Sequence, residues 1–229
     1  MSVDERMVHD IVQKVMANMQ ISGSVSGMHG VFKDMNDAIN ASIEAQKKVC
    51  TMTLDQREQI ISLIRKKTHE NAEILANMGV NETGMGNVGD KILKHHLTAD
   101  KVPGTEDIST VAWSGDRGLT LVEMGPFGVI GAITPATNPS ETVICNCIGM
   151  LAGGNTVVFN PHPNAKKTTI YTINMINEAS IEAGGPDNIA VTVEAPTLET
   201  SAIMMKHPSI HLLVATGGPG VVTAVLSSG

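Results

Sequence analysis

Residues 129–163 read VIGAITPATNPSETVICNCIGMLAGGNTVVFNPHP. This stretch contains two short apolar runs, Val129–Thr134 and Thr156–Phe159, and a helical pattern from Pro139 to Leu151 between them. Short runs of β-branched and aliphatic residues bounded by Gly and Pro are typical of buried strands. Two such strands joined by a helix form a βαβ unit, and this unit predicts a parallel sheet.

The same order of strand and helix continues toward the C-terminus. We expect helices at Ala165–Ala183, Leu198–Lys206 and Val221–Leu226, and strands at Ile189–Val193 and His211–Ala215. A repeated strand-helix order is most simply satisfied by a doubly wound parallel sheet with helices on both faces. The sequence therefore predicts an α/β fold for this region.

The first hundred residues are mainly helical in pattern. Three amphipathic helices are expected at Asp34–Val49, Thr53–Met78 and Val88–Lys101, the second opened by a capping box of Thr53 with Gln56, and a strand is expected at Leu119–Met124. We divide the chain into a helix over residues 1–19, a flexible linker over 20–30 and a domain over 31–229. The Gly- and Ser-rich linker leaves the first helix tethered, and a short isolated helix needs an apolar surface to lie on. This favours a partner-docking peptide, and the alternative is that the helix folds back onto its own domain or onto a sister subunit.

Composition excludes several classes of protein. A net charge of −7 disfavours binding to nucleic acid, and no apolar run approaches membrane-spanning length. The three cysteines are an odd number and no secretory signal precedes them, so we expect a reducing, cytoplasmic setting. Cys145 and Cys147 lie two positions apart in an expected helix and point in different directions, so we interpret both as packing residues and predict no metal site.

Ligands of wound parallel sheets collect at the carboxyl ends of the strands, where three loops stand out. The first runs from Thr134 to Glu141, the second is Asn160–Pro163, and the third is Thr216–Gly220. Each has an ordinary interpretation: Asn138 or Thr137 could simply cap a helix, His162 could be a surface residue, and the glycines could form a plain turn. The glycine spacing also differs from the six-residue dinucleotide fingerprint.

Taken together, GPFGVIG (125–131), TPATNP (134–139), LAGGNT (151–156), NPHP (160–163) and TGGPG (216–220) resemble the aldehyde dehydrogenase superfamily. The NPHP and TGGPG variants resemble its CoA-acylating branch, the acetaldehyde and propionaldehyde dehydrogenases of bacterial microcompartments. The resemblance implies a Rossmann-like NAD-binding domain. It also implies that residues 1–19 are a targeting helix that binds a microcompartment shell protein.

The activity implied by the resemblance is oxidation of a short-chain aldehyde. A cysteine thiolate forms a hemithioacetal, hydride passes to NAD, and CoA accepts the acyl group. NAD is thus the implied cofactor and CoA the co-substrate, in a homo-oligomer inside a microcompartment in the cytoplasm. Aldehyde chain length and the choice between NAD and NADP stay open.

Site residues carry over from the family by position. Asn138, or Thr137 as second choice, would hold the oxyanion of the intermediate. Cofactor-binding positions are Ile133, Thr134, Pro135 and Ala136 near the nicotinamide, Asn160, Pro161, His162 and Pro163 near the adenosine, and Thr216, Gly217, Gly218, Pro219 and Gly220 at the pyrophosphate. Non-acylating relatives carry Lys at the position of Asn160 and commonly Glu near Pro163. Their replacement implies a more open adenosine site that could admit NAD and CoA in turn.

The family's catalytic cysteine is expected beyond Gly229, and Cys50, Cys145 and Cys147 do not match it. We therefore expect a truncated nucleotide-binding domain, without the catalytic domain, that is inactive alone and exposes apolar surface. One alternative is a catalytically inactive nucleotide-binding or shell-docking module. A second, enzymatic alternative is a reductase of the same superfamily that acts on acyl phosphates.

Overall fold

The computed structural model describes residues 27–228, so the helix expected at 1–19 and most of the linker expected at 20–30 lie outside the described residues. The described chain forms a five-stranded sheet in the order β1-β6-β5-β4-β7. Every neighbouring pair in it is parallel. The strands are β1 (Val31–Phe32), β4 (Val129–Thr134), β5 (Thr156–Pro161), β6 (Ala190–Val193) and β7 (Ile210–Ala215). The parallel α/β sheet predicted from residues 129–163 is confirmed.

The order of the strands creates a switch point beside β4. From β4 the chain steps outward to β5 and then β6, and afterwards returns to place β7 on the other side of β4. Ligands of open α/β sheets bind in the crevice at such a reversal, outside the carboxyl ends of the strands. The candidate loops after β4, β5 and β7 all belong to this edge.

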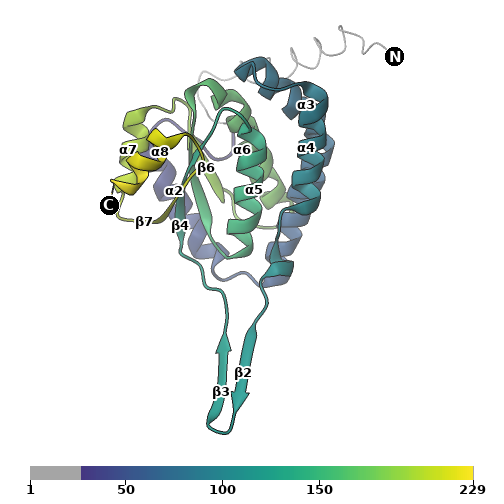
Figure 1. The fold of residues 1–229 in the computed structure, drawn as a ribbon, viewed down its shortest axis with the longest axis vertical. Coiled ribbons are helices and arrows are strands. Elements are labelled where there is room, and N and C mark those ends of the chain that lie inside the picture. Colours follow the sequence, from purple (N-terminus) through teal and green to yellow (C-terminus); the bar gives the residue numbers. More distant parts are fainter. Residues whose placement is uncertain (1–26, 229) are drawn as a thin grey trace.

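Helices cover both faces of the sheet (Figure 1). The helices α2 (Met35–Val49) and α7 (Leu198–Lys206) share one apolar cluster with the sheet. The opposite face is covered by α5 (Pro139–Ala152) and α6 (Lys166–Glu182), and α3 (Leu54–Thr83) packs on these two helices from outside. The helix α4 (Val88–Lys101) packs along α3 and also touches α5.

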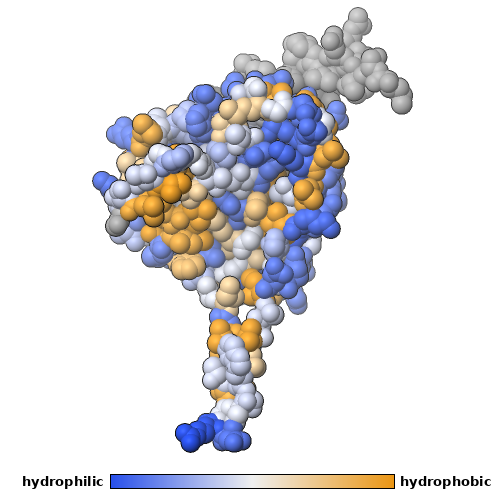
Figure 2. Space-filling view, viewed as in Figure 1, coloured by the Kyte–Doolittle hydropathy of each residue, from blue (hydrophilic) through white to orange (hydrophobic). Residues whose placement is uncertain are grey.

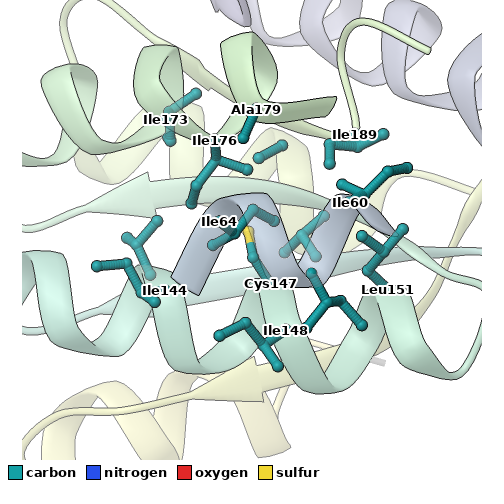
Figure 3. Packing of buried hydrophobic residues seen from close by; sticks show 14 of the residues in the cluster. Ile60, Ile64, Ile144, Cys147, Ile148, Leu151, Ile173, Ile176, Ala179 and Ile189 are labelled. Atoms are coloured by element: carbon teal, nitrogen blue, oxygen red, sulfur yellow. The ribbon is translucent and has the colours of Figure 1, made fainter. Parts of the chain in front are cut away.

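The alternation of side chains along the strands fills both cores. On β5, Val157 and Phe159 join the cluster under α5 and α6, whereas Val158 joins the cluster under α2 and α7. Figure 3 shows the larger cluster, in which isoleucines of α3, α5 and α6 interlock around Cys147. Full burial of an Ile or Leu side chain contributes roughly 1.5–3 kcal/mol, so these helices are held mainly by this packing.

The N-terminal helices follow the sequence pattern closely. The capping box of Thr53 with Gln56 is confirmed at the start of α3. The helix runs to Thr83, beyond the expected end at Met78, and stops at Gly84, which adopts a left-handed φ of 67°. The bounds of α4 are those expected, and Asn87 caps its first turn through Asp90 N.

Between α4 and β4 the chain forms an antiparallel hairpin of β2 (Val111–Gly115) and β3 (Gly118–Val122). Figure 1 shows it projecting from the body. The strand expected at Leu119–Met124 therefore exists in shifted form, and β2 was not expected. All residues of both strands are exposed, so their apolar side chains contribute nothing to the core.

An apolar surface lies at the β7 edge of the sheet. Among the described residues β7 pairs only with β4, and α8 (Pro219–Leu226) has no buried residue. Val222 and Leu226 are 41% and 76% exposed. Figure 2 shows apolar side chains gathered on the side where Figure 1 places α7, α8 and β7. The expected exposure of apolar surface is thus confirmed.

In residues 27–228, no helix combines the length and hydropathy that crossing a membrane requires.

Candidate functional site

The three candidate loops start side by side at the carboxyl edge of the sheet. In the strand register, Ile133 of β4 stands opposite Asn160 of β5 on one side and Ala215 of β7 on the other. The carbonyl of Ile133 accepts a hydrogen bond from Thr216 N at 3.0 Å, and that of Thr134 accepts one from His162 N at 3.1 Å. The loops at 134–139, 160–163 and 216–220 are therefore brought together at the switch point.

The glycine turn before α8 leaves open space around its backbone. A Cβ atom built on Gly218 or Gly220 would meet no atom within 4 Å, and neither residue has a positive φ. Packing and backbone geometry therefore do not require glycine at these two positions. A missing side chain here would let phosphate oxygens reach backbone N–H groups at a helix start, as a phosphate-binding turn requires.

The turn after β4 does not serve as a simple helix cap. Asn138 is the N-cap residue of α5 and Pro139 begins the helix, as expected, but the Asn138 side chain makes no capping hydrogen bond. Its Oδ1 instead accepts from Lys94 Nζ at 3.2 Å. Thr137 is exposed, and its carbonyl accepts from Lys91 Nζ at 2.9 Å. The capping interpretation of this turn is therefore wrong for the Asn138 side chain.

Two buried oxygens at this edge lack partners among the described residues. Thr134 is 1% exposed, and its Oγ1 makes no hydrogen bond there. Glu194, directly after β6, is half-buried, and its Oε1 atom is buried and likewise makes no hydrogen bond there. Val158 pairs with Val191, and continuing that register sets Glu194 level with Pro161, which itself pairs with Thr134. A buried oxygen without a partner is costly, so both atoms are suited to bonding a ligand or water. Glu194 was missed from the sequence, although an acidic residue right after a strand was a usable signal.

The loop after β5 is tied to neighbouring helices. Asn160 Oδ1 accepts from Thr200 Oγ1 at 2.7 Å, so this side chain lies toward the start of α7. His162 is exposed, and its Nδ1 accepts from Asn164 N at 3.1 Å within the short 3₁₀ turn Pro163–Ala165. Pro161 is buried and Pro163 exposed. This loop thus offers a ligand its exposed tip, His162 with Pro163, more than the Asn160 side chain.

The start of α6 is closed to anions by a carboxylate from α3. Glu82 accepts hydrogen bonds from Lys167 N at 2.7 Å and from Thr168 N at 2.8 Å. These are the N–H groups that a phosphate would otherwise use. Of the three helices that follow the candidate loops, α5 and α8 therefore remain as possible anion sites.

A buried polar cluster supports the Thr137–Pro139 turn from behind. Lys91 Nζ lies 3.4 Å from Glu141 Oε1, with side chains 3% and 8% exposed. His95 is fully buried, and its Nδ1 lies 2.7 Å from the Lys91 carbonyl, so this nitrogen donates. Burial lowers the pKa of His95, and its neutral Nε2 accepts from Ser140 Oγ at 2.7 Å. Nothing in the sequence pattern of α4 distinguished Lys91 or His95 from ordinary helix positions.

A model of the aldehyde dehydrogenase family matches residues 17–229. The chain belongs to the aldehyde dehydrogenase family. It is 46% identical over 227 residues to an acetylating acetaldehyde dehydrogenase of Bilophila wadsworthia, a match that covers 95% of this chain and 46% of the relative. This aldehyde dehydrogenase chain thus spans about half the length of that curated relative.

Solved structures of the family resemble this aldehyde dehydrogenase chain in fold. One is a propionaldehyde dehydrogenase from the Clostridium phytofermentans fucose utilisation bacterial microcompartment, with 72% identity and a TM-score of 0.87, covering 88% of this chain and 46% of that one. Another is the Rhodopseudomonas palustris propionaldehyde dehydrogenase with bound CoA and an acylated cysteine, with 48% identity and a TM-score of 0.85, covering 87% of this chain and 46% of that one. The resemblance inferred from the motifs is confirmed.

The cysteines of this aldehyde dehydrogenase chain lie apart from the candidate site chemistry. Cys147 is buried in the core, and this burial raises the pKa of its thiol, so it is a packing residue as expected. Cys145 is exposed, which corrects the expectation that it packs, because a shift of two positions along α5 turns its side chain to the surface. Cys50 is exposed at the end of α2.

Proposed function

We propose that this chain supplies the nucleotide-binding part of a CoA-acylating aldehyde dehydrogenase, which converts a short-chain aldehyde, CoA and NAD to acyl-CoA and NADH. The observation that carries the proposal is the meeting of the loops at 134–139, 160–163 and 216–220 at the switch point of the sheet. The acetylating relative and the CoA-bound structural neighbour support the reaction class.

The residues at this edge suit a dinucleotide. The open backbone at Gly218 and Gly220 would hold the pyrophosphate at the start of α8, and the loop at 133–136 would line the nicotinamide side. The buried Thr134 hydroxyl would form a hydrogen bond with the ligand, which would give it the partner that it lacks among the described residues. When bound, NAD accepts the hydride that leaves the aldehyde carbon.

We propose that NAD and CoA use the adenosine end of this site in turn. The loop at 160–163 presents no side-chain carboxylate or ammonium, and its tip is exposed at His162 and Pro163. The side chains of this loop include no anion that would repel the 3′-phosphate of CoA and no group that would require the ribose hydroxyls of NAD, and the one carboxylate that we place level with it, Glu194, lies on the neighbouring strand end. This supports successive binding of two adenosine-containing molecules with different phosphate patterns.

Asn138 is the proposed holder of the oxyanion, with Thr137 as second choice. Lys94 Nζ donates to Asn138 Oδ1, so the amide nitrogen Nδ2 is the group left to donate elsewhere. This Nδ2 bonds no described residue. A donor held in place before the reaction stabilises developing charge without having to reorganise.

The remaining proposals concern the setting of the protein. We propose that residues 1–19 dock on a microcompartment shell protein and that the protein works as a homo-oligomer inside such a compartment in the cytoplasm. Support comes from the amphipathic pattern of residues 1–19 and from the microcompartment origin of the 72% identical neighbour. Deleting residues 1–22 should abolish co-sedimentation with shell protein and leave the thermal midpoint unchanged. A large drop in that midpoint would instead indicate that the segment packs on its own domain.

The central experiment measures nucleotide binding and turnover. Calorimetry with NAD and with CoA is compared for the wild type, Gly218→Val and the control Gly115→Val, which also adds a side chain into open space, but in the hairpin. We expect Gly218→Val to weaken NAD binding by at least about tenfold, near 1.4 kcal/mol, and the control to leave it unchanged. Equal NAD binding by all three would contradict the proposed site. NADH formation from propanal, CoA and NAD tests the reaction in the full-length protein, because this chain alone is expected to be inactive. Nucleotide binding without turnover by the full-length protein would favour an inactive nucleotide-binding module.

A further inference from the structure

The helix α4 reaches the candidate catalytic turn with a buried cation. Lys91 Nζ donates to the Thr137 carbonyl at 2.9 Å and lies 3.4 Å from Glu141 Oε1 on the first turn of α5. The aliphatic part of Lys91 runs past Gly79 and Gly86, where a Cβ would lie 3.8 Å and 3.5 Å from it. Gly86 has a φ of 77°, so the backbone itself favours glycine there. The surroundings thus give the lysine stem a defined path to the turn.

A buried ion pair is a weak source of stability, because desolvation offsets much of the attraction between the charges. An apolar pair of similar volume would fill the space between α4 and α5 equally well. What an apolar pair could not supply is the hydrogen bond from Lys91 to the Thr137 carbonyl. This bond is therefore the specific consequence of having a lysine at position 91.

The Lys91 bond fixes the orientation of one peptide group. No described peptide bond is cis, so the C=O of Thr137 and the N–H of Asn138 point in opposite directions across their shared peptide plane. Because the carbonyl is directed at Lys91, the Asn138 N–H is directed away from α4. It donates to no described residue. A backbone donor is thus held free beside the Asn138 side chain.

His95 restrains the same turn one helical turn further along α4. Its Nε2 accepts the Ser140 hydroxyl at 2.7 Å, while Lys94 donates to the Asn138 side chain on the exposed side. Lys91, Lys94 and His95 thus hold the Thr137–Glu141 segment at several points. We expect these contacts to make the turn rigid.

We propose that Lys91 is a positioning residue that aims the Asn138 N–H at the oxyanion formed from the aldehyde. This inference rests on the proposed function. Lys91 does not touch the substrate; it acts through the Thr137 carbonyl. Loss of a preorganised oxyanion donor lowers kcat by about 10²–10³ in other enzymes, and loss of its anchor should have a smaller effect of the same kind.

The test separates the hydrogen bond from the charge. Lys91→Met removes both and leaves Glu141 unpaired, whereas the double variant Lys91→Met/Glu141→Leu replaces the whole pair by apolar side chains. Lys101→Met, an exposed position on the same helix, is the control. We expect the double variant to regain the thermal midpoint lost by Lys91→Met. We also expect kcat for propanal oxidation with NAD and CoA, measured with these substitutions in the full-length protein, to stay at least about tenfold low in the double variant, with KM for propanal little changed.

Recovery of kcat in the double variant would overturn the proposal, because Lys91 would then only neutralise Glu141. A second readout needs no catalysis: ¹⁵N relaxation of the Thr137 and Asn138 amides. These amides should be as rigid as α5 in the wild type and in Lys101→Met, and mobile in the double variant. Unchanged relaxation in the double variant would also overturn it. Absence of turnover in the full-length wild type would count against the proposed function alone, because the relaxation measurement still decides the role of Lys91.

Discussion

Cys147 shows how its surroundings set the chemistry of a side chain. It is buried between α3, α5 and α6, and this burial raises the pKa of the thiol because the thiolate would lose its hydration. Cys50 and Cys145 are exposed, although partial desolvation raises the pKa of the Cys145 thiol. The three thiols should therefore differ in reactivity within one folded chain.

Iodoacetamide labelling of the native chain at pH 8 should modify Cys50 first and Cys145 more slowly, and should leave Cys147 unmodified. In denaturant all three should react, because the unfolded thiols share one solvent environment. Mass spectrometry of peptides after timed labelling gives the three rates. Labelling of Cys147 as fast as Cys145 under native conditions would show that the core around α5 is open.

His95 predicts a pH dependence of stability. Burial lowers its pKa in the folded chain below the ordinary value of 6.5, so the unfolded chain takes up a proton that the folded chain does not. The free energy of unfolding should therefore fall as the pH drops from 7 toward 5. In His95→Gln this contribution is absent, so the stability difference between wild type and variant should shrink with falling pH.

Denaturant melts at several pH values measure this difference, and His211→Gln, a substitution of an exposed histidine, is the control. The control should follow the wild type at every pH. If the difference in unfolding free energy between wild type and His95→Gln stays constant from pH 7 to 5, His95 titrates alike in the folded and the unfolded chain.

At the scale of residues, the sequence located the loop positions but not their supports. Thr134, Asn160 and Thr216 could be predicted to meet because each follows an apolar run, and parallel strands end at one edge. Lys91 and His95 could not be identified, because their importance arises only when α4 packs beside α5. Such contacts join residues far apart in the chain and leave no local pattern.

At the scale of elements, the cap between α3 and α6 yields a prediction. Glu82 satisfies the N–H groups of Lys167 and Thr168 and also accepts from the Thr168 hydroxyl at 2.7 Å. Glu82→Ala should lower the free energy of unfolding by about 1–2 kcal/mol, the usual effect of losing a helix cap. Glu73→Ala, at an exposed position of the same helix, should change it by less than about 0.5 kcal/mol.

Urea unfolding followed by circular dichroism compares the two variants. Equal unfolding midpoints for Glu82→Ala and Glu73→Ala would mean that water replaces the carboxylate at the start of α6 without loss. The measurement also bears on the site, because removing this carboxylate would free N–H groups at a helix start beside the loop at 160–163.

The predictability of each element followed the strength of its hydrophobic pattern. The bounds of α4, α7 and β4 match the expectation. In each of these segments the hydrophobic pattern is clear, and residues that end a helix or strand flank it. The strand β1 has two residues, too few to show alternation. The strand β2 is exposed on both faces, so no burial pattern marked it.

At the scale of the whole molecule, the β7 edge should govern behaviour in solution. Exposed apolar side chains on α8 adjoin a strand with one neighbour among residues 27–228, and such surfaces promote association. Leu226→Lys should therefore reduce light scattering and dye binding by anilinonaphthalene sulfonate, with little change in thermal midpoint. Leu93→Lys, at an exposed position on α4, should have a smaller effect. Equal effects would show that association is not specific to this edge.

The parallel class of the sheet could be predicted from the order of strands and helices along the chain, but the spatial order of its strands could not. The alternation of strands and helices after Val129 implies parallel neighbours, yet it does not say where a strand returns. The position of β7 beside β4 depends on which faces α7 and β7 can cover together. The position of β7 is therefore decided by tertiary packing, and it creates the switch point beside β4.

The pairing of β1 with β6 has a consequence for synthesis of the chain. Val31 lies opposite Thr192, so the first of the described strands pairs with a strand that is synthesised much later. On the ribosome, β1 has no neighbouring strand until β6 has emerged, and the apolar face of α2 is covered only in part by β4 and β5 before then. The helices α3 and α4 can already pack on each other. A nascent chain stalled before residue 190 would thus expose Met35 and Ile39 to chaperones. Release of the chain from the chaperone should coincide with the emergence of β6 from the ribosome.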